Sequence, residues 1–122
     1  MNYTIKQVDK FKYIEEGEGE PLILLHGLFG ALSNFGDLIN YFKNHNKVVV
    51  PLLPLLDMDL LHTSVGGLQK FVHKFIEFQD YRNVHLLGNS LGGHVAILHV
   101  LKQPERIKSL ILTGSSGLFE NG

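Results

Sequence analysis

The sequence predicts an α/β fold, namely a mostly parallel sheet with helices on both of its faces. The first observation is that short runs of consecutive apolar residues recur along the chain without polar alternation. Strands of this kind are buried on both faces, which is typical of a parallel sheet between two layers of helices. The second observation is that these runs alternate with segments that have the apolar spacing of amphipathic helices. With 122 residues, the chain has room for one domain at most.

The N-terminal part is expected to contain three strands. Residues 3–8 and 11–15 read as short strands joined by the polar pair Asp9 and Lys10, which predicts an antiparallel start to the sheet. Residues 22–25 are all apolar and form the next expected strand. The parallel part of the sheet is therefore expected to begin with this third strand.

A helix and a fourth strand follow. Residues 34–42 predict a helix, with Ser33 or Asn34 as its N-cap, because a side-chain oxygen there can accept a hydrogen bond from the first turn. Residues 47–50 are expected to form a strand, and residues 51–59 a proline-containing loop.

The second half of the chain predicts two more helices and two more strands. The apolar stripes of the helices consist of Leu61, Val65, Leu68, Val72 and Phe75 in the first and Leu91, Val95, Leu98 and Leu101 in the second. The first helix is expected to end near the polar residues 79–83. The second must end near Pro104, because the residue before a proline is pushed out of helical dihedral angles. The expected strands span residues 84–87 and 109–113.

Residues 88–92 read Gly-Asn-Ser-Leu-Gly and connect an apolar strand to a helix. This is the G-x-S-x-G nucleophile elbow, in which Ser90 lies at the apex of a sharp turn and projects its hydroxyl from it. Small residues are needed around the apex, so Gly88, Asn89 and Gly92 are expected to support the site. The Leu91 amide opens the following helix and is a candidate oxyanion donor.

A second segment lies where the strand over residues 21–25 ends, and it reads His26-Gly27-Leu28-Phe29-Gly30. With both segments, the chain resembles the α/β-hydrolase superfamily, especially its small esterase and C–C-bond hydrolase branch. The resemblance covers essentially the whole chain. It implies that the Leu28 amide is the second oxyanion donor and that His26 and Gly27 support the site.

Two shorter segments also resemble this superfamily, and a third segment departs from it. Residues 17–21 look like its hairpin turn, and residues 103–107 look like its link from helix to strand. The loop over residues 51–59 lacks the glycine-rich D-x-x-G-x-G-x-S run of the family.

In α/β-hydrolases the catalytic residues follow the order serine, acid, histidine. Beyond Ser90 the carboxylates are Glu105 and Glu120, the histidines are His94 and His99, and no histidine follows either glutamate. The family order cannot be completed within residues 1–122. We therefore expect these residues to form the N-terminal part of one α/β-hydrolase domain, incomplete at its C-terminal edge, whose cap, C-terminal strands, acid and base lie on further polypeptide.

An incomplete domain has a consequence for the sheet and for activity. The strand over residues 110–112 would otherwise be a bare apolar edge, which is prone to aggregation. A lone serine is also a poor nucleophile without a general base. The isolated 122-residue chain is therefore expected to be inactive.

Composition excludes several classes of partner. There are 11 basic and 12 acidic residues, for a net charge of −1, so nothing indicates nucleic acid or an anionic membrane surface. The chain has no cysteine, which excludes disulfides and thiolate metal sites and fits a reducing compartment. Residues 1–6 show no signal peptide, and no apolar run is long enough to cross a membrane. We expect a cytoplasmic protein.

The chain has seven histidines, and histidine can act as a metal ligand or as a general base. His26 is expected to tie neighbouring loops together through its ring, and His94 to line the cavity wall or pack against His26, with a role as general base the minor alternative. The others show no metal-ligand spacing and are expected to be surface or packing residues: His45, His62, His73, His85 and His99. No metal and no cofactor are predicted. The side chains of Phe29, Leu32 and Phe35 suit either an acyl pocket or the core.

The function expected from this pattern is that of a serine hydrolase, acting on a small-molecule carboxylic ester or a related acyl or C–C substrate. Ser90 would attack the carbonyl, and the amides of Leu28 and Leu91 would hold the oxyanion. Two alternatives remain open: a cofactor-free perhydrolase or haloperoxidase-like enzyme on the same fold, and a non-catalytic ligand-binding module.

Overall fold

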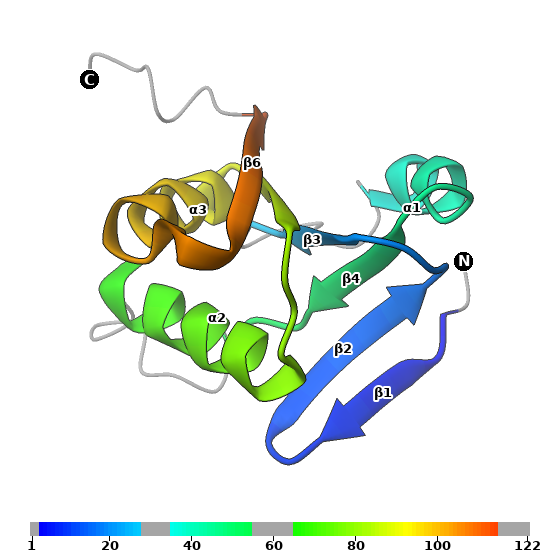
Figure 1. The fold of residues 1–122 in the computed structure, drawn as a ribbon, viewed down its shortest axis with the longest axis horizontal. Helices are drawn as coiled ribbons and strands as arrows, with labels where there is room; N and C mark the ends of the chain where they lie inside the picture. Colours follow the sequence, from blue (N-terminus) through cyan, green and yellow to red (C-terminus); the bar gives the residue numbers. More distant parts are fainter. Residues whose placement is uncertain (1–2, 28–34, 55–64, 115–122) are drawn as a thin grey trace.

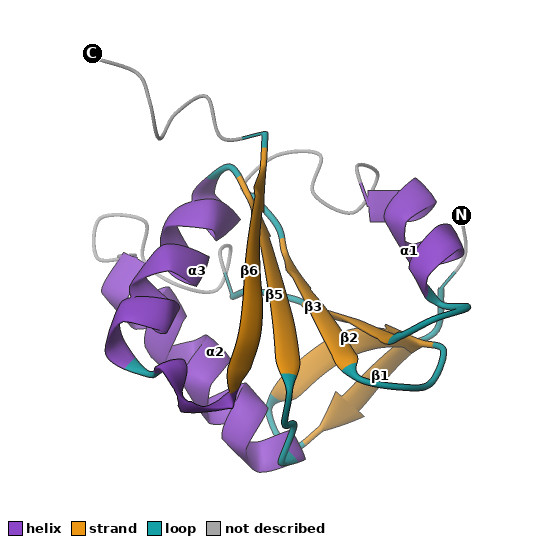
Figure 2. Ribbon diagram, turned by 45° about the horizontal axis from the view of Figure 1, so that its top comes forward, coloured by secondary structure: helices purple, strands orange, loops and turns teal. Residues whose placement is uncertain are grey.

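The computed structural model of the chain describes residues 3–27, 35–54 and 65–114, and these form one six-stranded sheet with helices on both faces (Figures 1 and 2). The strands are β1 (Ile5–Val8), β2 (Phe11–Glu16), β3 (Pro21–Leu25), β4 (Lys47–Pro51), β5 (Val84–Asn89) and β6 (Ile107–Thr113). The helices are α1 (Gly36–Phe42), α2 (Val65–Gln79), α3 (Leu91–Lys102) and the short 3₁₀ turn η2 (Pro104–Arg106). The predicted fold class is confirmed.

The sheet has the order β1-β2-β4-β3-β5-β6. The pairs β1–β2 and β2–β4 are antiparallel, and the pairs from β4 through β3 and β5 to β6 are parallel. The antiparallel start and the parallel remainder agree with the sequence analysis.

The segment over residues 17–21 is not a hairpin turn, so that prediction is wrong. Val48 of β4 is paired with Glu16 of β2 on one side and with Leu22 of β3 on the other. The segment therefore spans the width of β4 instead of joining two neighbouring strands. The segment reverses the direction of the chain, but the strand that separates β2 from β3 comes from about 30 residues later in the sequence.

The core has two parts, one on each face of the sheet. Alternate residues of β3 and β4 point to opposite faces, as expected for strands buried on both sides. On the α2 and α3 face the buried cluster includes Ile23, Leu25 and Val49. On the α1 face the cluster contains Ile14, Leu22, Leu24, Phe35, Ile39, Val48, Val50 and Leu87. Figure 2 shows α2 and α3 together on one side of the sheet and α1 on the other.

The start of α1 differs from the prediction. The helix begins at Gly36, and the preceding Phe35 makes no side-chain cap. The expected caps, Ser33 and Asn34, lie outside the described residues. Phe35 is only 1% exposed and packs in the core beside α1, which favours the core interpretation over an acyl pocket. Phe29 and Leu32 also lie outside the described residues.

The other helices agree with the sequence analysis where they are described. The second helix ends at Gln79, and α3 ends at Lys102, just before Pro104. The expected start of the second helix near Leu61 lies outside the described residues. No helix in the described part of the chain has the length and apolar content needed to cross a lipid bilayer.

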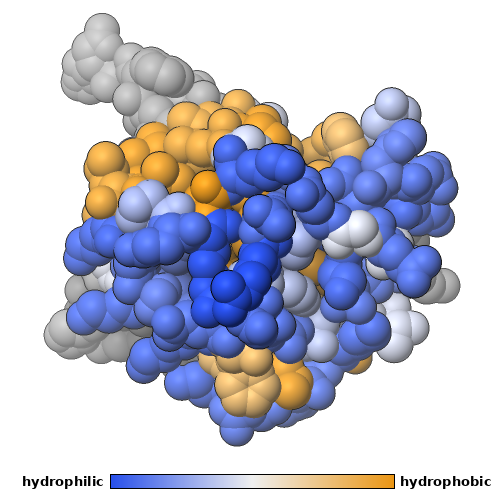
Figure 3. All heavy atoms as spheres, viewed as in Figure 1, coloured by the Kyte–Doolittle hydropathy of each residue, from blue (hydrophilic) through white to orange (hydrophobic). Residues whose placement is uncertain are grey.

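Strand β6 lies at one edge of the described sheet. Its side chains Leu110 and Ile111 are 37% and 39% exposed, and Leu101 on α3 is 75% exposed. Figure 3 shows hydrophobic residues gathered on the part of this face over β6 and α3. The bare apolar edge expected from the sequence is therefore present among the described strands.

Candidate active site

The backbone at Ser90 has the strained geometry of a sharp turn. Ser90 lies between the last residue of β5 and the first residue of α3, with φ 56° and ψ −119°. This conformation is sparsely populated for a residue with a side chain and costs about 1–3 kcal/mol, so it persists only where neighbouring contacts maintain it. Ser90 lies exposed at the carboxyl end of β5.

Glycines on both sides of Ser90 allow backbone segments to approach each other closely. A Cβ added at Gly88 would run into the carbonyl oxygen of Gly92. A Cβ added at Gly92 would overlap the carbonyl group of Leu25 and would lie 3.0 Å from the carbonyl oxygen of His26. The first turn of α3 therefore packs directly on the end of β3, and this close approach requires glycine at both positions.

The segment after β3 lies beside the serine. A Cβ added at Gly27 would be 3.3 Å from Ser90 Cβ and 3.6 Å from Ser90 Oγ. The predicted oxyanion donor Leu28 lies outside the described residues. The second predicted donor, Leu91, opens α3, where the first amides of a helix have no acceptor within the helix. The described part of the site thus brings Gly27, Ser90 and the N-terminus of α3 together.

The His26 ring connects two loops. Leu53 N–H donates to His26 Nε2 at 3.0 Å, so Nδ1 carries the proton and donates to the Gly27 carbonyl oxygen at 3.0 Å. Burial of the ring lowers its pKa below the usual value. His26 is 7% exposed and neutral, and its hydrogen bonds fit the loop-tying role expected from the sequence.

Thr113, at the end of β6, contacts the elbow and was not identified from the sequence. Its carbonyl oxygen accepts the Ser90 N–H at 3.3 Å, and its Oγ1 donates to Asn89 Oδ1 at 3.3 Å. Asn89 and Thr113 are register partners in the parallel β5–β6 pair. The available signal was that neighbouring parallel strands end at the same edge of a sheet, so the last polar residue of the strand after the elbow lies near the serine.

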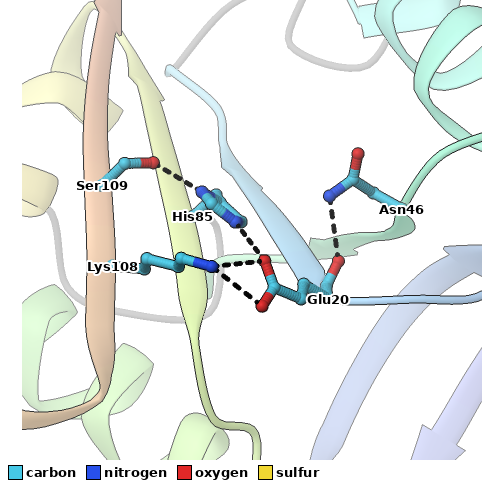
Figure 4. Close-up of polar contacts among 5 residues, drawn as sticks. All are labelled: Glu20, Asn46, His85, Lys108 and Ser109. Carbon is cyan, nitrogen blue, oxygen red and sulfur yellow. Dashed lines mark hydrogen bonds and ion pairs between the residues drawn. The ribbon is translucent and has the colours of Figure 1, made fainter.

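A cluster that contains a serine, a histidine and a carboxylate lies at the opposite end of β5 from Ser90 (Figure 4). His85 Nε2 is 2.9 Å from Glu20 Oε1, and His85 Nδ1 is 2.7 Å from Ser109 Oγ. Lys108 Nζ contacts both carboxylate oxygens of Glu20, at 3.2 and 3.1 Å. The hydrogen bonds from His85 and Lys108 lower the pKa of Glu20.

The serine of this cluster lacks the helix N-terminus that would be expected next to a nucleophile. Ser109 lies within β6 and is paired with His85 across the ladder, so no helix opens after it to offer amides to an oxyanion. The same contacts join residues at the starts of β3, β5 and β6. We therefore interpret the cluster of Glu20, His85, Lys108 and Ser109 as a bridge between strands.

The described histidines direct their hydrogen bonds away from Ser90. His94 is exposed on α3, and within the described part of the chain it has no hydrogen bond or ring contact with His26. In the described part of the chain, histidine side chains have hydrogen bonds with Gly27, Pro51, Leu53, Gln69, Ser109 and Glu20, and His73 contacts the carboxylate of Glu77. In residues 3–27, 35–54 and 65–114, no group of three or more histidines and carboxylates could hold a metal ion. A general base for Ser90 is thus not found in these ranges.

His99 is buried between α2 and α3. It is 2% exposed, and its Nδ1 accepts a hydrogen bond from Gln69 Nε2 at 2.9 Å. The same amide nitrogen donates to Gln103 Oε1 at 2.7 Å, which orients the Gln69 side chain. Burial, and secondarily the nearby His73, lower the pKa of His99 from 6.5 to about 4. His99 is therefore a packing residue that is neutral at ordinary pH.

This burial predicts a pH dependence of stability. As pH falls from 6.5 to about 4, the unfolded chain protonates His99 and the folded chain does not, so the free energy of unfolding falls across this range. The full contribution is roughly 3 kcal/mol. The measurement is urea unfolding of the protein and of the His99→Gln variant at several pH values. We expect the variant's stability to fall less steeply from pH 6.5 to 4; parallel curves would contradict the prediction.

Comparisons with known proteins give consistent matches. The family model Hydrolase_4, described as serine aminopeptidase S33, matches residues 55–119, more than half of the chain. Lipase 1 of Psychrobacter immobilis is 29% identical over 126 residues, with 98% of this chain and 39% of that protein covered. Lipase 3 of Moraxella sp. (strain TA144) is 28% identical, with 98% of this chain and 40% of that protein covered.

Solved structures extend this similarity to three dimensions. MGS-MChE2, an α/β hydrolase enzyme from the metagenome of sediments from the lagoon of Mar Chica in Morocco, is 52% identical, with a TM-score of 0.87. The match covers 96% of this chain and 54% of that chain. The chain thus spans about 40% of the two curated lipases and about half of this solved enzyme.

Proposed function

The chain belongs to the S33 serine aminopeptidase family of α/β-hydrolases, and from this premise we propose that the whole protein is a serine hydrolase in which Ser90 attacks a carboxylic ester or a related acyl compound. The observation that carries the proposal is the backbone of Ser90. A positive φ of 56° at an exposed serine, between a buried strand and a helix N-terminus, is a strained arrangement that serves to present a nucleophile.

The proposed reaction is acyl transfer in two steps. Ser90 Oγ forms a bond to the carbonyl carbon, its proton passes to a histidine base, and the leaving alcohol departs with that proton. Water then attacks the carbonyl carbon of the acyl-enzyme, which releases the carboxylic acid and regenerates the Ser90 hydroxyl. The Leu91 amide and the Leu28 amide hold the oxyanion in both steps. Each such donor contributes on the order of 100- to 1,000-fold to turnover in comparable enzymes.

The acid and the base are proposed to lie on polypeptide outside this chain, and residues 1–122 to be the N-terminal part of one domain. Two features of the described residues support this. The edge strand β6 exposes apolar side chains. An apolar groove of about 380 Å³ also lies on the α1 face of the sheet, with Leu38, Leu87 and Ile111 among its lining residues. We propose that the C-terminal polypeptide of the same protein covers both, because its relatives are roughly two to two and a half times as long as this chain.

The substrate is proposed to be a small ester, since two curated relatives are described as lipases. The test is intact mass spectrometry of the full-length protein before and after treatment with a fluorophosphonate, followed by mapping of the modified peptide. We expect a single adduct on the peptide that carries Ser90, and none on the peptide that carries Ser109. The hydrogen bond from Ser109 to His85 makes it the matched comparison serine.

Other outcomes of this experiment would indicate one of the two alternative functions. Labelled Ser90 without ester hydrolysis, but with turnover of peroxide and a carboxylic acid, would indicate a perhydrolase. An unlabelled protein that binds ligands reversibly would be a non-catalytic module, and the hydrolase proposal would then be wrong.

A further inference from the structure

We propose that Thr113 is a positioning residue for the nucleophile elbow, holding Ser90 in its strained backbone conformation from the neighbouring strand. The proposal rests on the proposed role of Ser90. It adds a residue of β6 to the residues on β3, β5 and α3 that form the site.

Thr113 contacts the elbow through both its backbone and its side chain. Its carbonyl oxygen accepts the Ser90 N–H, and its hydroxyl donates to Asn89 Oδ1, each at 3.3 Å. The other side of Ser90 is held by α3, because Gly93 N–H donates to the Ser90 carbonyl oxygen at 2.8 Å. The two peptide groups of Ser90 are therefore fixed by two different elements, and Thr113 provides the contact on the β6 side.

The residue after Thr113 is shaped to admit the Asn89 side chain. Gly114 has φ 50°, and a Cβ added there would collide with Asn89 Oδ1. The turn out of β6 thus passes directly over the side chain that Thr113 binds. Because an αL glycine allows this approach, the end of β6 and the elbow form one packed unit.

The chemical consequence follows from which atoms the Ser90 dihedral angles orient. Rotation about φ moves Ser90 Oγ relative to β5, and rotation about ψ moves the Leu91 N–H relative to Ser90 Oγ. A contact that fixes this residue therefore aligns the nucleophile with one proposed oxyanion donor. Small misplacements of reacting groups are costly, and an error of about 1 Å can reduce the rate about 100-fold.

The test compares three variants of the full-length protein. Thr113→Val removes the hydroxyl and keeps the branched shape, and Thr113→Ser keeps the hydroxyl. Ser109→Ala is the matched control, because it removes another hydrogen bond between β5 and β6, at the end far from the elbow. The readouts are kcat and KM for a short-chain p-nitrophenyl ester, the rate of fluorophosphonate labelling of Ser90, and Tm.

We expect Thr113→Val to lower kcat and the labelling rate by roughly tenfold with KM unchanged, and Thr113→Ser to stay within about twofold of the parent. Ser109→Ala is expected to lower Tm by as much as Thr113→Val does, without the loss of kcat. Equal activity of Thr113→Val and Ser109→Ala, or loss of activity in Thr113→Ser, would overturn the positioning role alone. A parent protein that is neither labelled nor active would overturn the proposed function and, with it, this role.

Discussion

Replacing Ser90 by alanine is expected to lower kcat/KM for a short-chain ester by on the order of 10⁵-fold in the full-length protein. The reason is that the substitution removes the atom proposed to form the covalent intermediate, while the proposed oxyanion donors remain and would support only residual catalysis. Ser90 is exposed, so the free energy of unfolding should change by less than about 0.5 kcal/mol. The measurements are steady-state ester hydrolysis and urea unfolding of both proteins.

Ser109→Ala is the control for this substitution. Ser109 has a histidine within hydrogen-bond distance, at 2.7 Å, but it lies inside β6, where no helix opens after it to offer amides to an oxyanion. Its activity should stay within about twofold of the parent, because a cross-strand hydrogen bond affects stability more than chemistry. Hydrolysis that survives in Ser90→Ala and is lost in Ser109→Ala would move the nucleophile to the second cluster and refute our assignment.

Gly92→Ala is expected to destabilise the fold by about 1–3 kcal/mol. Alanine would normally favour a helix by about 1 kcal/mol over glycine. Here the added Cβ meets the carbonyl group of Leu25 and lies 3.0 Å from the His26 oxygen, and these are backbone atoms that cannot move without displacing β3. Overpacking of this kind costs typically 1–3 kcal/mol, and the strain falls on the most buried strand. Urea unfolding of the full-length protein measures the loss.

A substitution elsewhere on α3 separates this contact from helix propensity. Lys102 is exposed at the end of the same helix, so Lys102→Ala should change the free energy of unfolding by no more than about 0.5 kcal/mol. If Gly92→Ala were as stable as Lys102→Ala, the close approach of α3 to β3 would not constrain the turn at Ser90 as described.

The fold class and most elements were predictable because they depend on local patterns. The apolar runs of β3, β4 and β5 and the proline after α3 act within a few residues, and the resemblance to α/β-hydrolases was confirmed by the comparisons. The order of the strands was not predictable in the same way. The position of β4 between β2 and β3 depends on pairing across some 30 residues, and the turn over residues 17–21 carries no local sign of it.

The same contrast between local patterns and distant contacts applies to the candidate site. The residues around Ser90 could be proposed as a nucleophile elbow because glycine spacing around a serine is a local signal, and their catalytic role stays a prediction. Thr113 was missed because its contact with Asn89 joins strands separated by the whole of α3. The sequence indicates only a surface or packing role for His99, because its burial against Gln69 depends on how α2 and α3 pack. The roles of Leu28 and Leu91 as oxyanion donors stay predictions.

The position of β4 in the sheet also bears on the order in which the protein can form during synthesis. β2 and β3 are consecutive strands in the sequence, but both pair with β4, so neither pairing can form until residues 47–51 have emerged. The other edge of β3 pairs with β5, which is synthesised more than 30 residues later. Among the described pairings, the β1–β2 hairpin is therefore the one that a nascent chain can complete early, and the β5–β6 pair beside Ser90 is expected to form last.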